Sequence, residues 1–210
     1  MLSLYRKEIE KFHSVFTMLL YVGKRTRPDL QVAVTFLGTR TLKADVDDWK
    51  KLKKLLAYII GTLNDRLILH SDNTDIIKWW TDASYGVHED MKSHTSGVMT
   101  LVTGAVYATR RKQRLTTVNS TESELVVTSD ALPQALWTSY FLQCQSVIVD
   151  DSLFGQDNMS TIKLATNGKL SSGKRTRHIK IRFFFIKDRI KSGYINTVYC
   201  HTDRMLANFF

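Results

Sequence analysis

The chain has 210 residues, 43% of them hydrophobic and 24% charged, which is ordinary for a folded protein of one or two domains. Its formal net charge of +10 favours an anionic partner such as nucleic acid. The two cysteines, Cys144 and Cys200, form no CxxC pair, which argues against a disulfide framework and a zinc site and predicts buried thiols in a reducing compartment.

No apolar run approaches the ~20 residues that cross a bilayer, and the first residues lack the apolar core of a secretory signal. We therefore expect an intracellular protein, cytosolic or nuclear, without a membrane partner.

Residues 1–63 show the period of helices. Apolar residues recur at helical spacing over 8–22, Pro28 suits the first position of a second helix, and acids at 45–48 begin a third helix that ends at Gly61. The third helix carries lysines on its other face, which form either a solvated surface or a nucleic-acid contact. We expect residues 1–63 to form a helical domain.

After residue 64 the period changes to that of strands. Residues 66–70 predict a short strand, and residues 75–81 predict a buried strand that ends at Asp82. Residues 97–103 and 105–111, joined by a Thr-Gly turn, predict a hairpin.

A long helix is predicted to begin at Ser120, with Asn119 as its cap and Glu122 three residues later. It continues to about Gln143, and Pro133 within it predicts a kink or a break, because proline lacks a backbone donor.

The last part of the chain again alternates strands and helices. Residues 152–156 predict a central strand that delivers Asp157, and a helix follows up to Asn167. After a basic loop, residues 178–192 predict a helix and residues 194–200 a strand. Thr202 or Asp203 is expected to cap a final helix.

Three acids, Asp82, Glu122 and Asp157, follow strands or begin helices. Brought together, they would form an oxygen-rich site for a divalent cation that acts on a phosphate backbone. A single acid at a helix start is more often a cap, and Glu122 and Asp157 both allow that interpretation.

Several motifs of the chain occur in a specific order: Thr26-Arg27-Pro28-Asp29-Leu30, Thr81-Asp82-Ala83-Ser84, Lys92-Ser93-His94-Thr95-Ser96-Gly97, Ser120-Thr121-Glu122-Ser123-Glu124, Asp157-Asn158 and Arg175-Thr176-Arg177-His178-Ile179. This order resembles copia-type retrotransposon Pol polyproteins, in the region where the reverse transcriptase connects to its ribonuclease H. The resemblance covers nearly the whole chain and includes no Tyr-x-Asp-Asp polymerase motif.

The resemblance implies an α/β fold with a ribonuclease H-like mixed five-stranded sheet flanked by helices. Residues 1–63 would be the helical reverse-transcriptase connection, and residues 64–210 a ribonuclease H-like domain that is truncated at its C-terminus. The implied reaction is metal-dependent hydrolysis of the RNA strand in RNA–DNA hybrids, with two Mg²⁺ ions expected and Mn²⁺ possible. The implied partners are the hybrid and the parent polyprotein.

The resemblance also assigns residues to these roles. The implied catalytic and metal-binding positions are Asp82, Glu122, Asp157 and Asn208. The basic residues expected to contact nucleic acid are Arg110, Arg111, Lys112, Arg114, Lys174, Arg175, Arg177 and His178, although a structural role at a helix start is equally open for His178.

One departure from the family pattern affects the expected activity. Asn208 stands where the family has a fourth metal-binding aspartate, and an amide supplies no counter-charge. We expect a weakened nuclease. The alternatives are an inactive remnant or nucleic-acid-binding module of the same fold, and a basic scaffold whose helical half contacts protein. Asp203 is expected to be a cap, and His201 to be structural.

Overall fold

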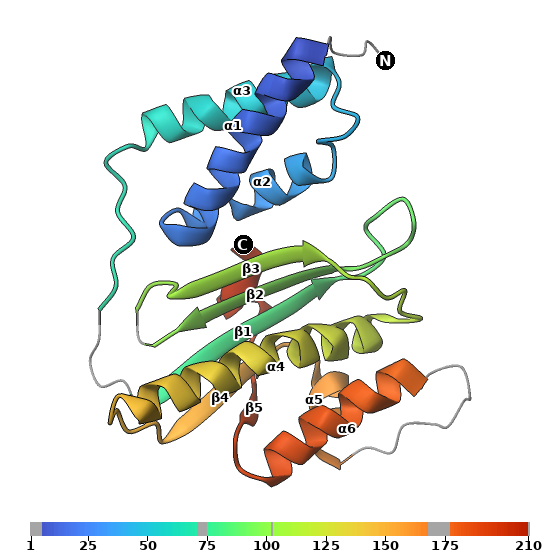
Figure 1. Ribbon diagram of the computed structural model, residues 1–210. Coiled ribbons are helices and arrows are strands. Elements are labelled where there is room, and N and C mark those ends of the chain that lie inside the picture. Colours follow the sequence, from blue (N-terminus) through green and yellow to red (C-terminus); the bar gives the residue numbers. More distant parts are fainter. Residues whose placement is uncertain (1–5, 71–74, 102, 168–176, 210) are drawn as a thin grey trace. The chain divides into compact units, whose positions relative to one another are not determined.

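A computed structural model of the chain describes residues 6–70, 75–101, 103–167 and 177–209 (Figure 1). The chain divides into two compact units, Met1–Ile68 and Leu69–Phe209. Within the ranges given above, no helix combines the length and the apolar character that crossing a membrane requires.

The first unit is helical, as the periodicity predicts. It contains α1 (Arg6–Arg25), η1 (Pro28–Leu30), α2 (Gln31–Gly38) and α3 (Val46–Gly61). Phe12, Leu30 and Leu52 are buried between these helices. The acids before α3 form a capping box, in which Asp45 accepts from Asp48 N at 2.9 Å and Asp48 accepts from Asp45 N at 3.2 Å.

The second unit is built on a five-stranded sheet. Its strands are β1 (Ile76–Ser84), β2 (His94–Thr100), β3 (Tyr107–Lys112), β4 (Asp151–Gln156) and β5 (Asn196–Tyr199), in the order β3-β2-β1-β4-β5. β1, β2 and β3 pair antiparallel, whereas β4 pairs parallel with both β1 and β5. The predicted mixed sheet and hairpin are confirmed. The strand predicted over residues 66–70 is wrong, because only an isolated bridge joins His70 to Thr103.

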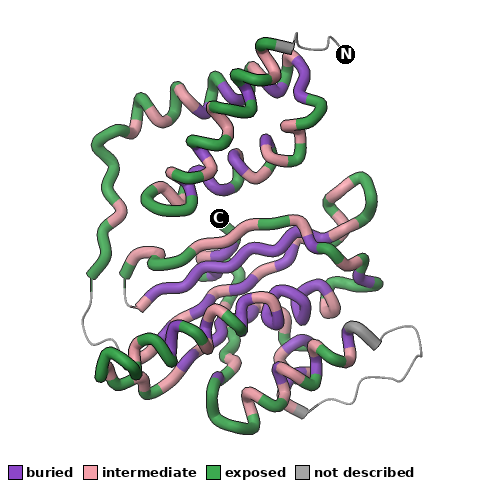
Figure 2. Tube along the Cα trace, in the orientation of Figure 1, coloured by how far each residue is buried: buried purple, intermediate pink, exposed green. Residues whose placement is uncertain are grey.

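Three helices cover one face of the sheet: α4 (Ser120–Cys144), α5 (Met159–Asn167) and α6 (Arg177–Lys191) (Figure 1). Figure 2 shows burial concentrated along β1, β2 and the sheet-facing side of α4. At the centre of the core, Trp79 of β1 stacks on Phe154 of β4 with ring centroids 5.8 Å apart.

Pro133 lies inside the continuous helix α4, so the predicted break is wrong, and the alternative of a kink stays a prediction. Pro133 itself is exposed, while its neighbours Leu132 and Ala135 are buried and hold both halves of the helix on the core. Cys144 at the end of α4 is exposed, so the expectation of a buried thiol is wrong there, and Cys200 is only partly buried.

The end of the chain lies on the opposite face of the sheet. It forms two 3₁₀ turns, η3 (Thr202–Arg204) and η4 (Leu206–Phe209), in place of the predicted α-helix. η4 packs against β1 and β2, and Ser96 Oγ of β2 donates to the carbonyl of the buried Ala207 at 2.7 Å. Ser96 pairs with Asp82 across the two strands. Successive side chains of a strand point to opposite faces, so Asp82, three residues after the core residue Trp79, points away from the helices.

Candidate metal centre

Three carboxylates from separate elements meet at one end of the sheet. Asp82 of β1, Glu124 of α4 and Asp157 after β4 each offer an oxygen, and these oxygens all lie within 4.8 Å of one another. The parallel pairing of β1 with β4 ends at Trp80 and Gly155, and each aspartate comes two residues later. Both strands therefore deliver an acid at their carboxyl ends. Across the described ranges, this is the only group of three His, Cys, Asp or Glu residues with such geometry.

Glu124 is held between the two central strands. The residue is 5% exposed, its Oε1 accepts from Ala83 N of β1 at 3.0 Å, and its Oε2 accepts from Gln156 Nε2 of β4 at 3.1 Å. Both carboxylate oxygens are thus oriented before any cation binds.

The structure brings Glu124, rather than Glu122, to the two aspartates. Glu122 accepts from Val118 N at 2.9 Å and donates its own N–H to Asn119 Oδ1 at 2.9 Å, so its carboxylate caps the start of α4. Two residues along a helix correspond to a rotation of about 200°, which directs the two acids to opposite sides. No local signal in the sequence separates the two acids, because Leu125 lies nearly one helical turn after Glu122 and only one residue after Glu124.

Two carboxyl groups of the cluster, those of Glu124 and Asp82, have raised pKa values in the absence of a cation. Burial, followed by the negative charge of Asp82, raises the pKa of Glu124 to about 8. The pKa of Asp82 is also raised, first by burial and then by the charge of Asp157, while a hydrogen bond from Ala83 N and the charge of Arg110 act in the opposite direction. A divalent cation would relieve this repulsion.

The donor set fits Mg²⁺ or Mn²⁺, which prefer hard oxygen ligands. Opposite oxygens around an octahedral Mg²⁺ lie about 4.2 Å apart, given Mg–O lengths of about 2.1 Å. The three ligand oxygens lie within 4.8 Å of one another, which is on the scale of such a coordination shell.

Asn208 is connected to the cluster through Thr202. The exposed Asn208 donates from Nδ2 to the carbonyl of Thr202 at 3.1 Å, and Thr202 Oγ1 donates to Asp157 Oδ2 at 3.0 Å. Asp203 lies beside His201, with 3.3 Å between Oδ2 and Nδ1, and His201 caps η3. The cap expected at Thr202 or Asp203 is therefore one residue earlier.

The basic residues of β3 alternate between the two faces of the sheet. Arg110 pairs with Ser96, which pairs with Asp82, so the three side chains share one face, and the charge of Arg110 lowers the pKa of Asp82. Arg111 points to the helix side, where its Nη2 lies 3.0 Å from Asp130 Oδ2 of α4. The contact of Arg111 with nucleic acid stays a prediction, and this ion pair makes Arg110 the stronger candidate of the two.

The other predicted nucleic-acid contacts are less informative. Lys112 Nζ lies 2.8 Å from Asp90 Oδ1, and Arg114 is exposed. Lys174 and Arg175 lie outside the described residues, as do the side chains of Arg177 and His178.

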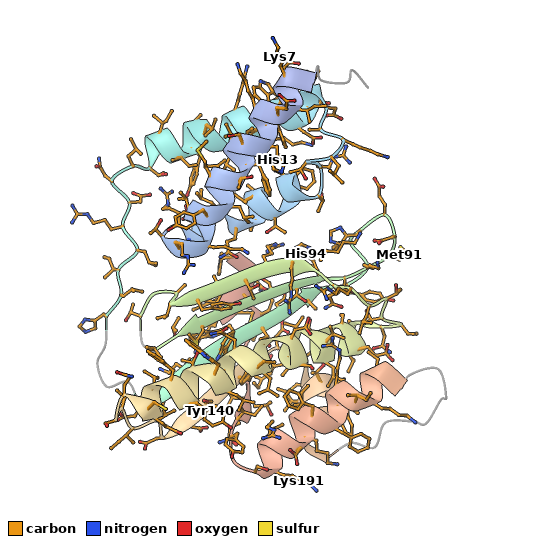
Figure 3. All side chains as sticks on the ribbon, viewed as in Figure 1. Lys7, His13, Met91, His94, Tyr140 and Lys191 are labelled. Atoms are coloured by element: carbon orange, nitrogen blue, oxygen red, sulfur yellow. The ribbon has the colours of Figure 1, made fainter. Side chains whose placement is uncertain are left out.

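A pair of histidines closes the loop between β1 and β2. His88 Nε2 lies 2.9 Å from His94 Nδ1, and Figure 3 shows His94 on β2 near the loop that carries Met91. Burial lowers the pKa of His94 to about 4 and also lowers the pKa of His88, so both rings are neutral near pH 7. This pair orders the loop without adding positive charge.

The chain is similar in sequence to retrotransposon Pol polyproteins. It is 27% identical over 198 residues to the Retrovirus-related Pol polyprotein from transposon TNT 1-94 of Nicotiana tabacum, a match that covers 94% of this chain and 15% of that protein. It is 26% identical over 185 residues to the corresponding polyprotein from transposon RE2 of Arabidopsis thaliana, with 87% and 13% covered. The chain thus spans a small fraction of these relatives.

Comparison with solved structures gives weaker likenesses. The structure of LC11-RNase H1, isolated from compost, aligns with 64% of this chain and 91% of its own, at 11% identity and a TM-score of 0.46. No protein-family model matches the chain.

Proposed function

We propose that residues 69–209 form a divalent-cation-dependent nuclease that hydrolyses the RNA strand of RNA–DNA hybrids, as part of a retrotransposon polyprotein. The observation that carries the proposal is the convergence of Asp82, Glu124 and Asp157 within 4.8 Å in a chain of net charge +10. Similarity to Pol polyproteins over most of the chain supports it.

Each residue of the cluster has a distinct part in this proposal. Asp82, on the central strand, would be the central cation ligand, with Glu124 on one side of it and Asp157 on the other. A bound pair of Mg²⁺ ions supplies an activated water and neutralises the charge that develops on the leaving oxygen. Glu124 is already oriented by Ala83 N and Gln156 Nε2, so little reorganisation is needed when it binds.

Substrate binding in this proposal uses charge beside the cluster. Arg110 shares a sheet face with Asp82, where it can contact a phosphate that approaches the site. Contacts of this kind do not depend on base sequence, and they make affinity sensitive to salt. Discrimination in favour of the hybrid would come from duplex shape and 2′-hydroxyl groups.

A second candidate function is hybrid binding without cleavage. Asn208 favours it, because the position that the family resemblance assigns to a fourth aspartate carries a neutral amide that donates to Thr202 O. The raised pKa of Glu124 favours it as well, because a cation must displace a proton near pH 7.

The two candidates are separated by one assay on the 210-residue chain. A labelled RNA–DNA hybrid, an RNA duplex and a DNA duplex are incubated with Mg²⁺, with Mn²⁺ or with EDTA, and binding is followed by fluorescence anisotropy on the same substrates. Asp82→Asn serves as the control, since it keeps the shape of the central ligand and removes its charge.

The nuclease proposal predicts cleavage of the RNA strand of the hybrid alone, dependent on the ion and abolished by Asp82→Asn, with hybrid binding retained. Binding without cleavage under either ion would support the second candidate. Cleavage that persists in Asp82→Asn, or the absence of both cleavage and hybrid binding, would overturn the proposal.

A further inference from the structure

Gln156, the last residue of β4, connects two members of the carboxylate cluster. The residue is 2% exposed and lies next to Asp157 in the chain. Its Nε2 donates to Glu124 Oε2 at 3.1 Å, while its Oε1 accepts from Asp157 N at 3.0 Å and from Asn158 N at 3.4 Å. One side chain therefore contacts α4, the backbone of the second aspartate and the residue that caps α5.

Only an amide can make this set of contacts. The two backbone N–H groups require an acceptor, and the Glu124 carboxylate requires a donor. The opposite amide orientation would place the NH₂ group against the two N–H donors and the oxygen against the carboxylate, so the network determines which end is which. A glutamate at position 156 would add a second negative charge against Glu124, and a leucine would leave all three partners without this side chain.

The contacts of Gln156 act on both ligands at once. The Glu124 carboxylate accepts one hydrogen bond from Ala83 N on β1 and one from Gln156 Nε2 on β4. Gln156 therefore holds this carboxylate on the β4 side. The same amide fixes the turn at Asp157, whose own carboxylate accepts from Thr202 Oγ1 at 3.0 Å. One side chain therefore forms hydrogen bonds with the carboxylate of Glu124 and with the backbone of Asp157.

We propose that Gln156 is a positioning residue that sets the separation of Glu124 and Asp157 for cation binding. This inference rests on the proposed function of the cluster as a metal site. It assigns to Gln156 no contact with substrate or with the reacting atoms. A residue that orients ligands in this way typically contributes about 10- to 100-fold to metal affinity.

Gln113 provides a matched control within the same unit. It is also a glutamine, is also 2% exposed, and also binds α4, where its Nε2 donates to the carbonyl of Ser123 at 3.1 Å. Its side chain makes no recorded contact with the carboxylates. Gln113→Leu therefore removes a buried amide that binds Ser123, the residue next to Glu124 in the chain, without changing the hydrogen bonds of the cluster.

The test measures binding of Mn²⁺ to the metal-free 210-residue chain by isothermal titration calorimetry, together with thermal unfolding. Gln156→Leu should lower Mn²⁺ affinity about 10-fold or more relative to Gln113→Leu, while both lower the unfolding temperature. Should Gln156→Leu not fold, Gln156→Asn keeps an amide but shortens its reach, and it should lower Mn²⁺ affinity in the same direction.

The outcomes separate this inference from the proposed function. The positioning role alone would be overturned if Mn²⁺ binding depends on Asp82 but has the wild-type affinity in Gln156→Leu. If Gln156→Leu does not fold, the same result in Gln156→Asn would overturn it. Absence of Mn²⁺ binding by the wild-type chain, or binding unaffected by Asp82→Asn, would overturn the metal site and this inference with it. An equal loss of affinity in Gln113→Leu would show a general packing effect and would also overturn the inference.

Discussion

Replacing Glu124 and Glu122 one at a time by glutamine tests which acid of α4 belongs to the metal centre. The two residues have the same side chain and lie two positions apart, so the substitutions match in chemistry and differ only in place. Glu124→Gln removes one of the three clustered carboxylates, whereas Glu122→Gln alters the acceptor of Val118 N at the helix start. Only Glu124→Gln should weaken cation binding.

The expected magnitudes differ clearly. Loss of one of three anionic ligands from a buried site should cost at least about 1.4 kcal/mol of binding free energy, which is about tenfold in affinity. Glu122→Gln retains an oxygen that can accept from Val118 N, so its effect on the free energy of unfolding should stay within about 0.5 kcal/mol. Its effect on Mn²⁺ affinity should be within about twofold, since Glu122 lies outside the cluster.

Glu124 also makes the stability of the metal-free protein depend on pH. Its pKa is raised from 4.5 to about 8 in the folded state, so between these values the folded state binds more protons than the unfolded state. The free energy of unfolding therefore falls as the pH rises through this window. At about 1.4 kcal/mol per pKa unit, the whole fall is about 4 to 5 kcal/mol, of which about 3 kcal/mol is lost by pH 7.

Glu124→Gln should remove most of this fall, leaving a smaller slope of the same sign from Asp82, whose pKa is also raised. The slope is more diagnostic than the absolute stability, because the new NH₂ group must face either Ala83 N or Gln156 Nε2, both of which are donors. Urea unfolding in EDTA at several values between about pH 5 and about pH 8 measures the slope, and calorimetry with Mn²⁺ measures affinity. Loss of Mn²⁺ binding in Glu122→Gln but not in Glu124→Gln, or an unchanged slope in Glu124→Gln, would refute the reasoning.

Four further substitutions test other parts of the structure. Asn208→Asp should raise Mg²⁺ affinity and Mg²⁺-dependent cleavage of the hybrid, and equal activity at low Mg²⁺ would show that this position lies outside the metal shell. Arg110→Gln should weaken hybrid binding and reduce the slope of log affinity against log salt by about one, as measured by fluorescence anisotropy. Arg111→Gln, which loses its ion pair with Asp130, should leave that slope unchanged and lower the urea midpoint, and equal effects of the two arginines would contradict their opposite orientations. Asp45→Ala removes the side-chain half of the capping box and should destabilise the first unit by about 1 kcal/mol; urea unfolding that shows no loss of stability would contradict the capping role of Asp45.

Both aspartates of the cluster could be proposed as ligands from the sequence, because Asp82 lies near the carboxyl end of one short apolar strand and Asp157 directly follows another. Choosing between Glu122 and Glu124 was harder. The capping signal at Asn119 correctly located the helix start and pointed to Glu122, which does serve as a capping acid. The side of the helix that faces the sheet is decided by packing of residues such as Leu125, and the local motif does not express it.

The orientation of the basic residues also depends on pairing. Strand alternation requires Arg110 and Arg111 to point to opposite faces, but only the register with β2 shows which of them shares a face with Asp82. The network of Gln156 was not predictable for a similar reason, since its carboxylate partner Glu124 lies 32 residues earlier in the chain. Contacts of this kind arise from tertiary structure.

The position of β1 in the sheet has a consequence during synthesis on the ribosome. β1 can pair with the β2–β3 hairpin as soon as these neighbouring segments have emerged, but its other partner, β4, ends at Gln156, roughly 70 residues after Ser84. At about 5 to 20 residues per second, the second edge of β1 waits roughly 4 to 14 s for its partner. During that interval the nascent chain presents Trp79 and Ile77 on an open strand, so a chaperone that shields this edge should raise the yield of folded protein.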